Sequence, residues 1–469
     1  MERLEDQLGL LARLHLQRWK QGPIRSSDTD RAEKWVMAVG SRMLTVPGAF
    51  RAKVVNGSLH VKMLHMARTW AERTNVLRLF YDVAASGERL PDVDVVYVHS
   101  DQDPAPTFGW PCATWRDGAA CKGMQVPLLG NAVEHKLLKS TFPVPEFSWA
   151  GWKRQLPWCH LAAAFARKGK LAPWRTRRDQ AYFAGSLENG RWRRRLRALV
   201  AAQLRKGARD LVVKDVSSDF FHWRGGRATK AVGRAGGSSP RTMGDGGQGR
   251  GIATKMDPID APCGYRYALS MPGYGYSNRL RSLLACGCVV LHIRPPWEEY
   301  FTPLLQNEVH WVEIDHVADI LPTLERLRAN ETHAMRIARA GRHLALRALS
   351  YRRVLDYLRL LLVEISRMQP ERVVLSSGYQ RIQSPRDLLK LAALCECRSE
   401  AERDASCSHR DVCCDGYNCP TKELGCPNGS GVHYRESLLP EKPRPAESRR
   451  PEQWPAHWPV RWKSHFLDI

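Results

Sequence analysis

The chain has 469 residues, 43% of them hydrophobic and 9% aromatic, which is enough apolar material for more than one core and excludes a wholly disordered protein. Its formal net charge of +24 favours contact with polyanions such as nucleic acid, anionic glycans or nucleotide phosphates. No apolar run reaches the roughly 18 residues that span a bilayer, and no zinc-finger, RNA-recognition or KH motif indicates a dedicated nucleic-acid function.

The N-terminal residues predict an amphipathic helix, because leucines recur there at helical spacing: Leu4, Leu8, Leu11 and Leu14. No basic stretch followed by an apolar core is evident, so the sequence shows no signal peptide. Residues 50–61 then predict a β-hairpin with Asn56-Gly57 as its turn, and we expect a helix over 66–85. A strand predicted at 93–98 ends in an acidic loop, at a position where open α/β sheets bind ligands.

Helix and strand signals alternate beyond that loop, which is typical of layered α/β proteins. We expect strands at 180–184, 211–213, 267–271 and 288–293. Residues 217–251 are rich in Gly, Arg and Ser, so they predict a flexible surface insertion. Apolar residues return at helical spacing over 316–368 and predict two C-terminal helices.

Seven of the 13 cysteines fall within residues 395–426, among polar and turn-forming residues. This density predicts a disulfide-stapled segment and an oxidising compartment. Zinc is the alternative, disfavoured because two spaced C-x-x-C pairs are missing. Three N-x-S/T sequons agree with a lumenal location: Asn56, Asn330 and Asn428. The Pro-, Arg- and Glu-rich residues 440–469 predict a disordered tail.

The stretch 265–293 reads as strand, Gly-rich turn, helix and strand. Its turn combines glycines, N-cap candidates and arginines: Gly273, Gly275, Ser277, Asn278, Arg279 and Arg281. The glycines allow a tight turn, and the helix N-terminus offers free N–H donors and the positive end of a dipole. This arrangement favours an anion site, where the arginines would add bidentate contacts to a diphosphate. The alternative is an ordinary connection with solvated arginines.

A second basic site is predicted after the strand at 180–184, where small residues again precede arginines at a helix start: Gly185, Ser186, Arg191 and Arg193. The run 191–195 read alone is equally compatible with a solvated helix face. Trp149 and Trp152 lie in an aromatic cluster whose flat rings would stack on a sugar, with core packing as the alternative.

Asp101 and Asp103 follow the strand at 93–98 and suit a general base that deprotonates an acceptor hydroxyl. The same two residues mimic a metal-holding D-x-D motif, of which Asp92 and Asp94 form a second copy. A spacing of two residues is too common to decide between base and metal ligand.

Taken in chain order, six segments resemble the Rumi-like (capsule-associated-protein-like) O-glycosyltransferases. These segments are 54–61, 91–97 with the downstream Asp101, 147–152, 181–186 with a following arginine, 274–290, and 296–303 before 309–310. The resemblance implies an α/β protein with two Rossmann-like domains of the GT-B type, to which this chain adds a Cys-rich C-terminal appendage. It also implies an inverting, metal-independent transfer that needs no cofactor beyond a UDP-sugar donor, with glucose or xylose expected as the sugar.

Residue by residue, the resemblance places the catalytic base at Asp101. It places donor contacts at Gly185, Ser186, Arg191 or Arg193, Gly275, Ser277 and Arg279, with Glu299 facing the ribose hydroxyls. Asp103, Trp149 and Trp152 are expected on the side of the acceptor, a protein or glycan hydroxyl. No metal ligands and no specific nucleic-acid partner are expected.

The expected organisation is an N-terminal helical segment at 1–49, an acceptor-side domain at 50–175 and a nucleotide-sugar-binding domain at 176–370. The expected location is the lumen of the endoplasmic reticulum or Golgi. The insertion at 217–251 and the cysteines at 395–426 lie outside the shared pattern. Two alternatives stay open: a metal-dependent transferase, and a non-catalytic protein that binds polyanions or glycans.

Overall fold

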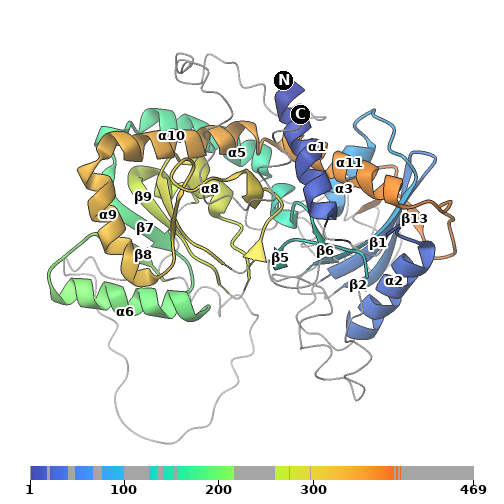
Figure 1. Cartoon of the computed structure of the whole chain (residues 1–469), viewed down its shortest axis with the longest axis horizontal. Coiled ribbons are helices and arrows are strands. Elements are labelled where there is room, and N and C mark those ends of the chain that lie inside the picture. Colours follow the sequence, from blue (N-terminus) through green and yellow to red (C-terminus); the bar gives the residue numbers. More distant parts are fainter. Residues whose placement is uncertain are drawn as a thin grey trace, which may run out of the picture.

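The structure is a computed structural model that describes residues 2–17, 19, 22–40, 48–66, 76–99, 126–134, 141–151, 157–215, 259–273, 275–295, 297–384, 387–388 and 391. Two lobes lie side by side, each built on a β-sheet covered by helices (Figure 1). The first sheet has six strands and the second has five. The α/β class expected from the sequence is confirmed.

The first sheet has the strand order β13-β2-β1-β3-β4-β6. Its strands are β1 (Gly48–Val55), β2 (Ser58–Met66), β3 (Val93–His99), β4 (Leu128–Gly130), β6 (Thr141–Pro143) and β13 (Gln380–Arg381). β1 and β2 form the predicted hairpin, and its turn residues Asn56 and Gly57 have φ values of 51° and 75°. Two positive φ values suit the twist of a tight hairpin, which explains the Asn-Gly pair.

This first sheet is mixed rather than doubly wound. β3, β4 and β6 run parallel, whereas β1 pairs antiparallel with both β2 and β3. The first lobe therefore departs from the Rossmann-like pattern that we expected for it. β2 also continues to Met66, so the helix expected from that residue begins instead at Val76, as α3 (Val76–Ala84).

Helices cover both faces of the first sheet: α1 (Glu2–Leu16), α3 and α11 (Tyr351–Met368) on one, and α2 (Ser26–Gly40) on the other. Leu8 and Leu11 of α1 are buried, which confirms the amphipathic N-terminal helix. Because α11 packs against α1 and α3, it belongs to the first lobe. The domain boundary expected at 370 is therefore corrected, since the chain returns to the first lobe from Tyr351.

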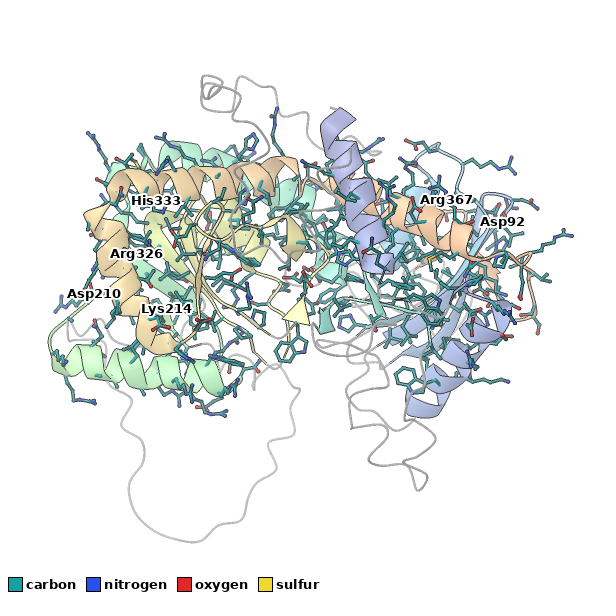
Figure 2. All side chains as sticks on the ribbon, in the orientation of Figure 1. Asp92, Asp210, Lys214, Arg326, His333 and Arg367 are labelled. Carbon is teal, nitrogen blue, oxygen red and sulfur yellow. A yellow bond between two sulfur atoms is a disulfide. The ribbon has the colours of Figure 1, made fainter. Side chains whose placement is uncertain are left out.

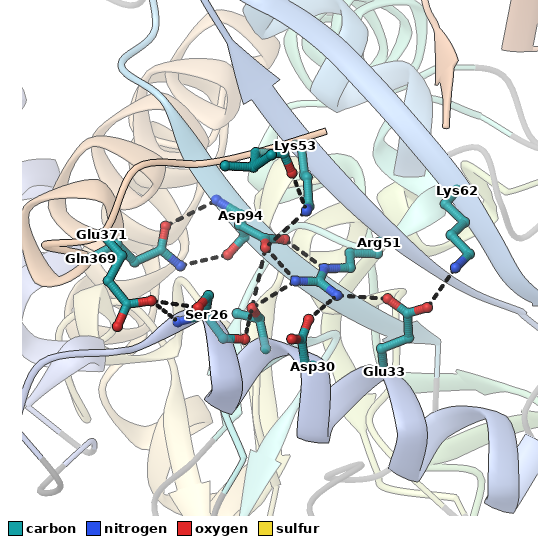
Figure 3. A network of polar contacts seen from close by, with 11 residues as sticks. Ser26, Asp30, Glu33, Arg51, Lys53, Lys62, Asp94, Gln369 and Glu371 are labelled. Atoms are coloured by element: carbon teal, nitrogen blue, oxygen red, sulfur yellow. Dashed lines mark hydrogen bonds and ion pairs between the residues drawn. The ribbon is translucent and has the colours of Figure 1, made fainter. Parts of the chain in front are cut away.

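α2 docks on the sheet through a buried network of charges (Figure 3). Arg51 of β1 is 4% exposed, and its Nε donates to Asp94 of β3 at 2.8 Å. Its Nη1 donates to Asp30 and Glu33 of α2, both at 2.7 Å. Lys53 lies 3.6 Å from the Asp94 carboxylate. Each buried cation in this network therefore has a carboxylate beside it.

The second sheet is parallel throughout, with the order β12-β10-β9-β7-β8. Its strands are β7 (Arg178–Ala184), β8 (Leu211–Lys214), β9 (Tyr265–Ser270), β10 (Val289–Ile293) and β12 (Val312–Ile314). The four strands predicted here are confirmed. Asp210 precedes β8 and Lys214 ends it, which marks the direction of the parallel strands in Figure 2.

The strand order reverses between β7 and β9, because β8 lies on one side of β7 and all later strands lie on the other. Parallel α/β sheets bind ligands beyond the carboxyl ends of the two strands at such a reversal. In the part of this lobe that the structure describes, the helices are α5 (Trp158–Leu171), α6 (Arg191–Arg205), α8 (Leu280–Ala285), α9 (Ile320–Ala329) and α10 (Glu331–Arg347). We therefore expect the ligand site at the turns that follow β7 and β9.

Three helices, α9, α10 and α11, occupy the region where we expected two. The first break falls at Asn330, whose side chain caps α10 by accepting the His333 N–H at 3.0 Å. Cys263 and Cys286 form a disulfide that the sequence analysis did not foresee. The insertion at 217–251, the Cys-rich segment at 395–426 and the tail at 440–469 lie outside the described residues. None of the helices within the described ranges is long and apolar enough to cross a membrane.

Candidate functional site: a basic crevice at the strand reversal

The turns after β7 and β9 touch each other at the reversal point. The turn after β7 reaches α6 through Gly190, which has a φ of 97°. A Cβ atom at Gly190 would lie 3.0 Å from the carbonyl oxygen of Gly273, and one at Gly273 would lie 3.1 Å from Arg193 Nη2. Glycines at these positions therefore allow the two backbones and an arginine to meet.

Two arginines enter this crevice from different elements and flank Phe183 of β7. Arg193 of α6 lies 5.6 Å from the Phe183 ring centroid, and Arg279, just before α8, lies 5.3 Å from it. Arg193 donates to the carbonyls of Met271 at 3.2 Å and Pro272 at 3.1 Å. Arg279 donates to the Ala184 carbonyl. Both guanidinium groups are thus fixed by backbone oxygens.

Neither Arg193 nor Arg279 has a carboxylate within ion-pair distance among the described residues. Burial and, to a smaller extent, the positive charge of Arg279 together lower the pKa of Arg193 to about 9. Burial likewise lowers the pKa of Arg279 to about 10. Two desolvated cations without a counter-charge are costly, so the crevice is electrostatically suited to an anion. A diphosphate matches its paired, forked donors.

Gly185 makes room for one of these arginines. It follows β7, and its N–H donates to the Lys214 carbonyl at 2.9 Å. A Cβ atom there would lie 2.8 Å from Arg279 Nη1 and 3.0 Å from Phe183 Cζ. Any larger residue must therefore displace the guanidinium group. The neighbouring Ser186 accepts from Arg193 Nη1 through its carbonyl oxygen at 3.4 Å.

A pocket of about 340 Å³, including its open mouth, lies beside the crevice at the ends of β9 and β10. Its lining includes Ser270, Ser277, His292, Trp297, Glu299 and Thr302. His292 Nδ1 lies 3.1 Å from Ser270 Oγ, and the ring stacks on Trp311 with centroids 4.2 Å apart. Burial lowers the pKa of His292 to about 3, so this imidazole is neutral at physiological pH.

Glu299 is the acidic residue of this pocket. It is 6% exposed, and burial raises its pKa to about 8. Ser277 Oγ and Trp297 Nε1 are buried in the same lining and have no hydrogen-bond partner among the described residues. The pocket thus offers an acceptor and unpaired donors to a polar ligand next to the anion-binding crevice. A nucleoside attached to a diphosphate has this combination of groups.

Arg281 does not reach the crevice, which corrects its expected contact with a diphosphate. Its side chain is 0% exposed and pairs at 2.7 Å with Glu146, which follows β6 in the first lobe. Its guanidinium also lies 4.1 Å from the ring centroid of Trp149. The helix that carries it, α8, has six residues and begins at Leu280 without a side-chain cap, so neither Ser277 nor Asn278 is its N-cap.

Trp149 is also corrected. It is 0% exposed and packs edge-on against Trp158 of α5, with ring centroids 5.5 Å apart. No face of this ring is open to a sugar, so the alternative of core packing holds. Arg191 is exposed and lies 4.1 Å from the ring centroid of Trp192. Of the two arginines considered at the start of α6, Arg193 is the one in the crevice.

Asp92 and Asp94 do not form a metal-binding pair. Asp92 Oδ1 accepts the Asn56 N–H at 2.7 Å, whereas Asp94 is held by Arg51. Asp92 lies near the end of α11 (Figure 2), where its carbonyl oxygen accepts from Ser366 Oγ at 2.8 Å. Asp101, Asp103 and Trp152 lie outside the described residues. Within the described ranges, no group of three or more His, Cys, Asp or Glu side chains is placed to hold a metal ion.

Comparison with known proteins decides the family. The sequence pattern of glycosyl transferase family 90 matches residues 36–414, which include both sheets, the crevice and the pocket. The chain belongs to this family. The basic crevice and the adjoining pocket are therefore the candidate active site of a family 90 protein.

Among curated proteins, the chain is similar to protein O-glucosyltransferase 1 of Bos taurus, with 30% identity over 121 residues. That match covers 26% of this chain and 31% of the bovine protein. The O-glucosyltransferase rumi of Drosophila pseudoobscura pseudoobscura is 31% identical over 143 residues, covering 26% of this chain and 34% of the fly protein. The chain thus spans about a third of the length of these relatives.

Several residues of the site were missed in the sequence. Phe183, which separates the two arginines, reads as an ordinary apolar residue of a buried strand. Ser270 and His292 lie at the carboxyl ends of two neighbouring strands and face each other in the pairing of β9 with β10. Polar residues at the ends of two adjacent parallel strands indicate a ligand site, but this signal requires knowing that the two strands are neighbours. Trp297 and Thr302 lie in the segment 296–303 that resembles the family, but the sequence alone assigns neither of them a role.

Proposed function

We propose that this family 90 protein is an inverting glycosyltransferase. It moves a sugar, glucose or xylose, from a UDP-sugar to a hydroxyl of a protein or glycan acceptor. The observation that carries the proposal is a pair of arginines at the strand reversal, the buried Arg193 and the partly buried Arg279, which have no carboxylate beside them among the described residues. A diphosphate supplies the missing negative charge, and the same arginines stabilise it as a leaving group.

The donor nucleotide follows from the neighbouring pocket. The diphosphate contacts Arg193, Arg279 and the turn at Gly185 and Ser186, while the backbone at Gly275 and the Ser277 hydroxyl approach it from the other turn. The ionised carboxylate of Glu299 accepts hydrogen bonds from the ribose hydroxyls in the pocket. Because Arg193 and Arg279 neutralise the leaving group, the transfer needs no metal ion in this proposal.

Asp101 is proposed as the general base, with Asp103 beside the acceptor. A sugar or serine hydroxyl is a poor nucleophile at neutral pH, so a carboxylate within hydrogen-bond reach must accept its proton during attack. β3, which ends at His99, leads into this loop. The attacking oxygen forms the new glycosidic bond as the bond to UDP breaks, and the anomeric configuration inverts.

A donor screen tests the proposal. We expect hydrolysis or transfer with UDP-glucose or UDP-xylose, and less with UDP-galactose or a GDP-sugar. UDP should also raise the melting temperature, since a ligand that binds only the folded state stabilises it. Absence of both turnover and nucleotide binding would overturn the proposed function. Loss of activity with EDTA and recovery with manganese would favour the metal-dependent alternative.

Asp101→Asn tests the base. The amide keeps the size of the carboxylate but cannot take up a proton, so we expect transfer to fall by about a hundredfold or more. UDP binding, measured by calorimetry, should stay within about twofold of wild type because the base does not contact the nucleotide. If Asp103→Asn is inactive while Asp101→Asn is active, the base is Asp103. Full activity in both variants would exclude this mechanism.

A binding function remains the second candidate, because α6 carries six arginines and no acidic residue. Arg194 and Arg195 are exposed on it. This hypothesis predicts association with heparin or RNA that weakens steeply with salt and does not depend on UDP. Micromolar UDP affinity together with donor turnover would contradict it.

The proposed location is the endoplasmic reticulum or Golgi lumen, where the Cys263–Cys286 disulfide would persist. The remaining free thiol among the described cysteines is Cys288, which is buried, and burial raises its pKa to about 12. We also propose disulfides rather than zinc for residues 395–426. Mass spectrometry of the non-reduced protein tests both proposals, since free thiols throughout would contradict them.

A further inference from the structure

A buried ion pair joins the two lobes directly behind the proposed donor pocket. Arg281 of α8 and Glu146 of the first lobe are 1% exposed each, and they are 2.7 Å apart. Ser148 completes the cluster by hydrogen-bonding to both of them. The preceding residue of α8, Leu280, lines the pocket that contains Glu299. The pocket wall and the lobe junction therefore share the first turn of α8.

Stability alone gives no reason for this pair. Replacing a buried ion pair by apolar residues of similar volume is often neutral or stabilising, because taking two charges out of water is costly. The surroundings are apolar and would accept such a replacement, since the guanidinium lies 4.1 Å from the Trp149 centroid and 5.2 Å from that of Trp158. A role in the neighbouring donor pocket would explain why Glu146 and Arg281 are charged.

Contacts and charge both connect the pair to the segment of Glu299. The Arg281 guanidinium lies 4.1 Å from the Trp149 ring centroid, and the Trp149 ring lies 5.8 Å from that of Tyr300, the residue after Glu299. Burial raises the pKa of Glu299 to about 8, the positive charge of Arg281 lowers it, and the negative charge of Glu146 raises it again. Among the described residues, the other titratable groups near Glu299 include Glu298 and Tyr300 on its own segment and the neutral His292 across the pocket. Arg281 is thus the cation that favours an ionised Glu299, and Glu146 limits that effect.

We propose that Glu146 and Arg281, which reach the site from different lobes, are positioning residues that set the charge Glu299 presents to the ribose hydroxyls of the donor. The inference rests on the proposed function, because it gives Glu299 the role of hydroxyl acceptor. It adds that the first lobe takes part in donor binding through a residue that does not touch the donor.

The pH dependence of UDP affinity tests the inference. Ionised Glu299 binds the ribose, so affinity should be full above pH 8 and fall about tenfold per pH unit well below it. In Glu299→Gln the affinity should vary with pH only through the titration of UDP itself. The difference between wild type and this variant is then the pH dependence that comes from Glu299. Calorimetry from pH 5.5 to 9 on the full chain gives the midpoint for each variant.

Two variants then move the midpoint in opposite directions. Glu146→Gln leaves the field of Arg281 unopposed, so we expect the midpoint to fall by about one pH unit or more. The double variant Glu146→Met with Arg281→Met removes both charges. Since the effect of Arg281 is the larger of the two on Glu299, the midpoint should rise. The double variant also guards against a Glu146→Gln protein that does not fold, because it leaves no unpaired buried charge.

Asp94→Asn is the matched control, because it breaks a buried ion pair remote from the pocket. It should lower stability and leave the midpoint where it is in wild type. Unmoved midpoints in both Glu146 variants, or a Glu299→Gln protein that keeps the full pH dependence, would overturn the inference while leaving the proposed function intact. A wild-type chain that binds no UDP at any pH would overturn both.

Discussion

Buried arginines occur in both lobes, but their surroundings differ. In the first lobe, Arg51 is bonded to Asp94, Asp30 and Glu33 (Figure 3). In the second lobe, Arg193 and Arg279 donate only to backbone carbonyls among the described residues. Arg51 and Arg193 are buried and Arg279 is partly buried, yet among the described residues only Arg51 has carboxylates beside it.

The pKa values reflect this difference. Carboxylate partners outweigh burial at Arg51 and raise its pKa above the ordinary value. At Arg193 and Arg279 burial dominates, and both values fall. A buried cation with carboxylates beside it contributes to the fold. A missing carboxylate does not by itself identify a ligand site, because Arg177 is also buried and donates to the carbonyls of Ala172 and Gly287. Arg193 and Arg279 differ from Arg177 because they lie at the strand reversal, where parallel sheets bind ligands.

The largest effect is expected from Asp94→Asn, which breaks the compensated network. The change removes the main partner of Arg51 and leaves Lys53 beside an amide. Breaking a buried ion pair costs several kcal/mol, so we expect the free energy of unfolding to fall by about 3 kcal/mol. Urea unfolding measures this loss.

UDP affinity of the folded Asp94→Asn protein should stay within about twofold of wild type, because Asp94 belongs to the network under α2. An Asp94→Asn protein with wild-type stability would show that the charge network of the first lobe does not stabilise the fold. The contrast between Arg51 and the arginines of the second lobe would then be wrong.

The next effect is expected from Arg279→Met, which removes an uncompensated cation. Removing one partner of a buried charge pair typically costs 2–5 kcal/mol of binding, so UDP affinity should fall by about a hundredfold. Stability should change by less than about 1 kcal/mol, because one hydrogen bond is lost while the cost of a buried charge is relieved. Calorimetry and urea unfolding measure the two quantities.

Arg195→Gln is the control for that substitution, since Arg195 is an exposed arginine of α6 without a described partner. It should leave UDP affinity unchanged. A large loss of stability in Arg279→Met with little loss of UDP affinity would make Arg279 a structural residue.

Local chemistry explains what the sequence predicted well. The turn at Asn56-Gly57 requires two positive φ values, and few other residue pairs adopt them. The parallel strands are short apolar runs bounded by turn residues, so β7 and β9 were foreseen within a few residues. Gly185 and Arg279 were assigned to the site because small residues and arginines followed those strands.

Tertiary contacts explain what the sequence did not predict. Arg279 and Arg281 are two residues apart in the same Gly-rich stretch, and only the position of Glu146, 135 residues from Arg281, separates their roles. Trp149 looks like a sugar platform in the sequence, but Trp158 packs against it. The disulfide between Cys263 and Cys286 likewise depends on a pairing that the sequence does not specify.

The smallest effect, and the finest test of the crevice, is expected from Gly185→Ala. The new Cβ would lie 2.8 Å from Arg279 Nη1, so the guanidinium must move. Gly185 is not among the glycines with positive φ, so the backbone accepts alanine without strain. Arg279 is flexible and its displacement costs little stability, but it spoils the geometry of a bidentate contact. We expect UDP affinity to fall about tenfold, which corresponds to about 1.4 kcal/mol.

Gly264→Ala is the matched control, since a Cβ there meets no atom within 4 Å. If Gly185→Ala binds UDP as wild type does, the ligand does not depend on where Arg279 lies, and the crevice loses one of its two proposed arginine contacts to the diphosphate.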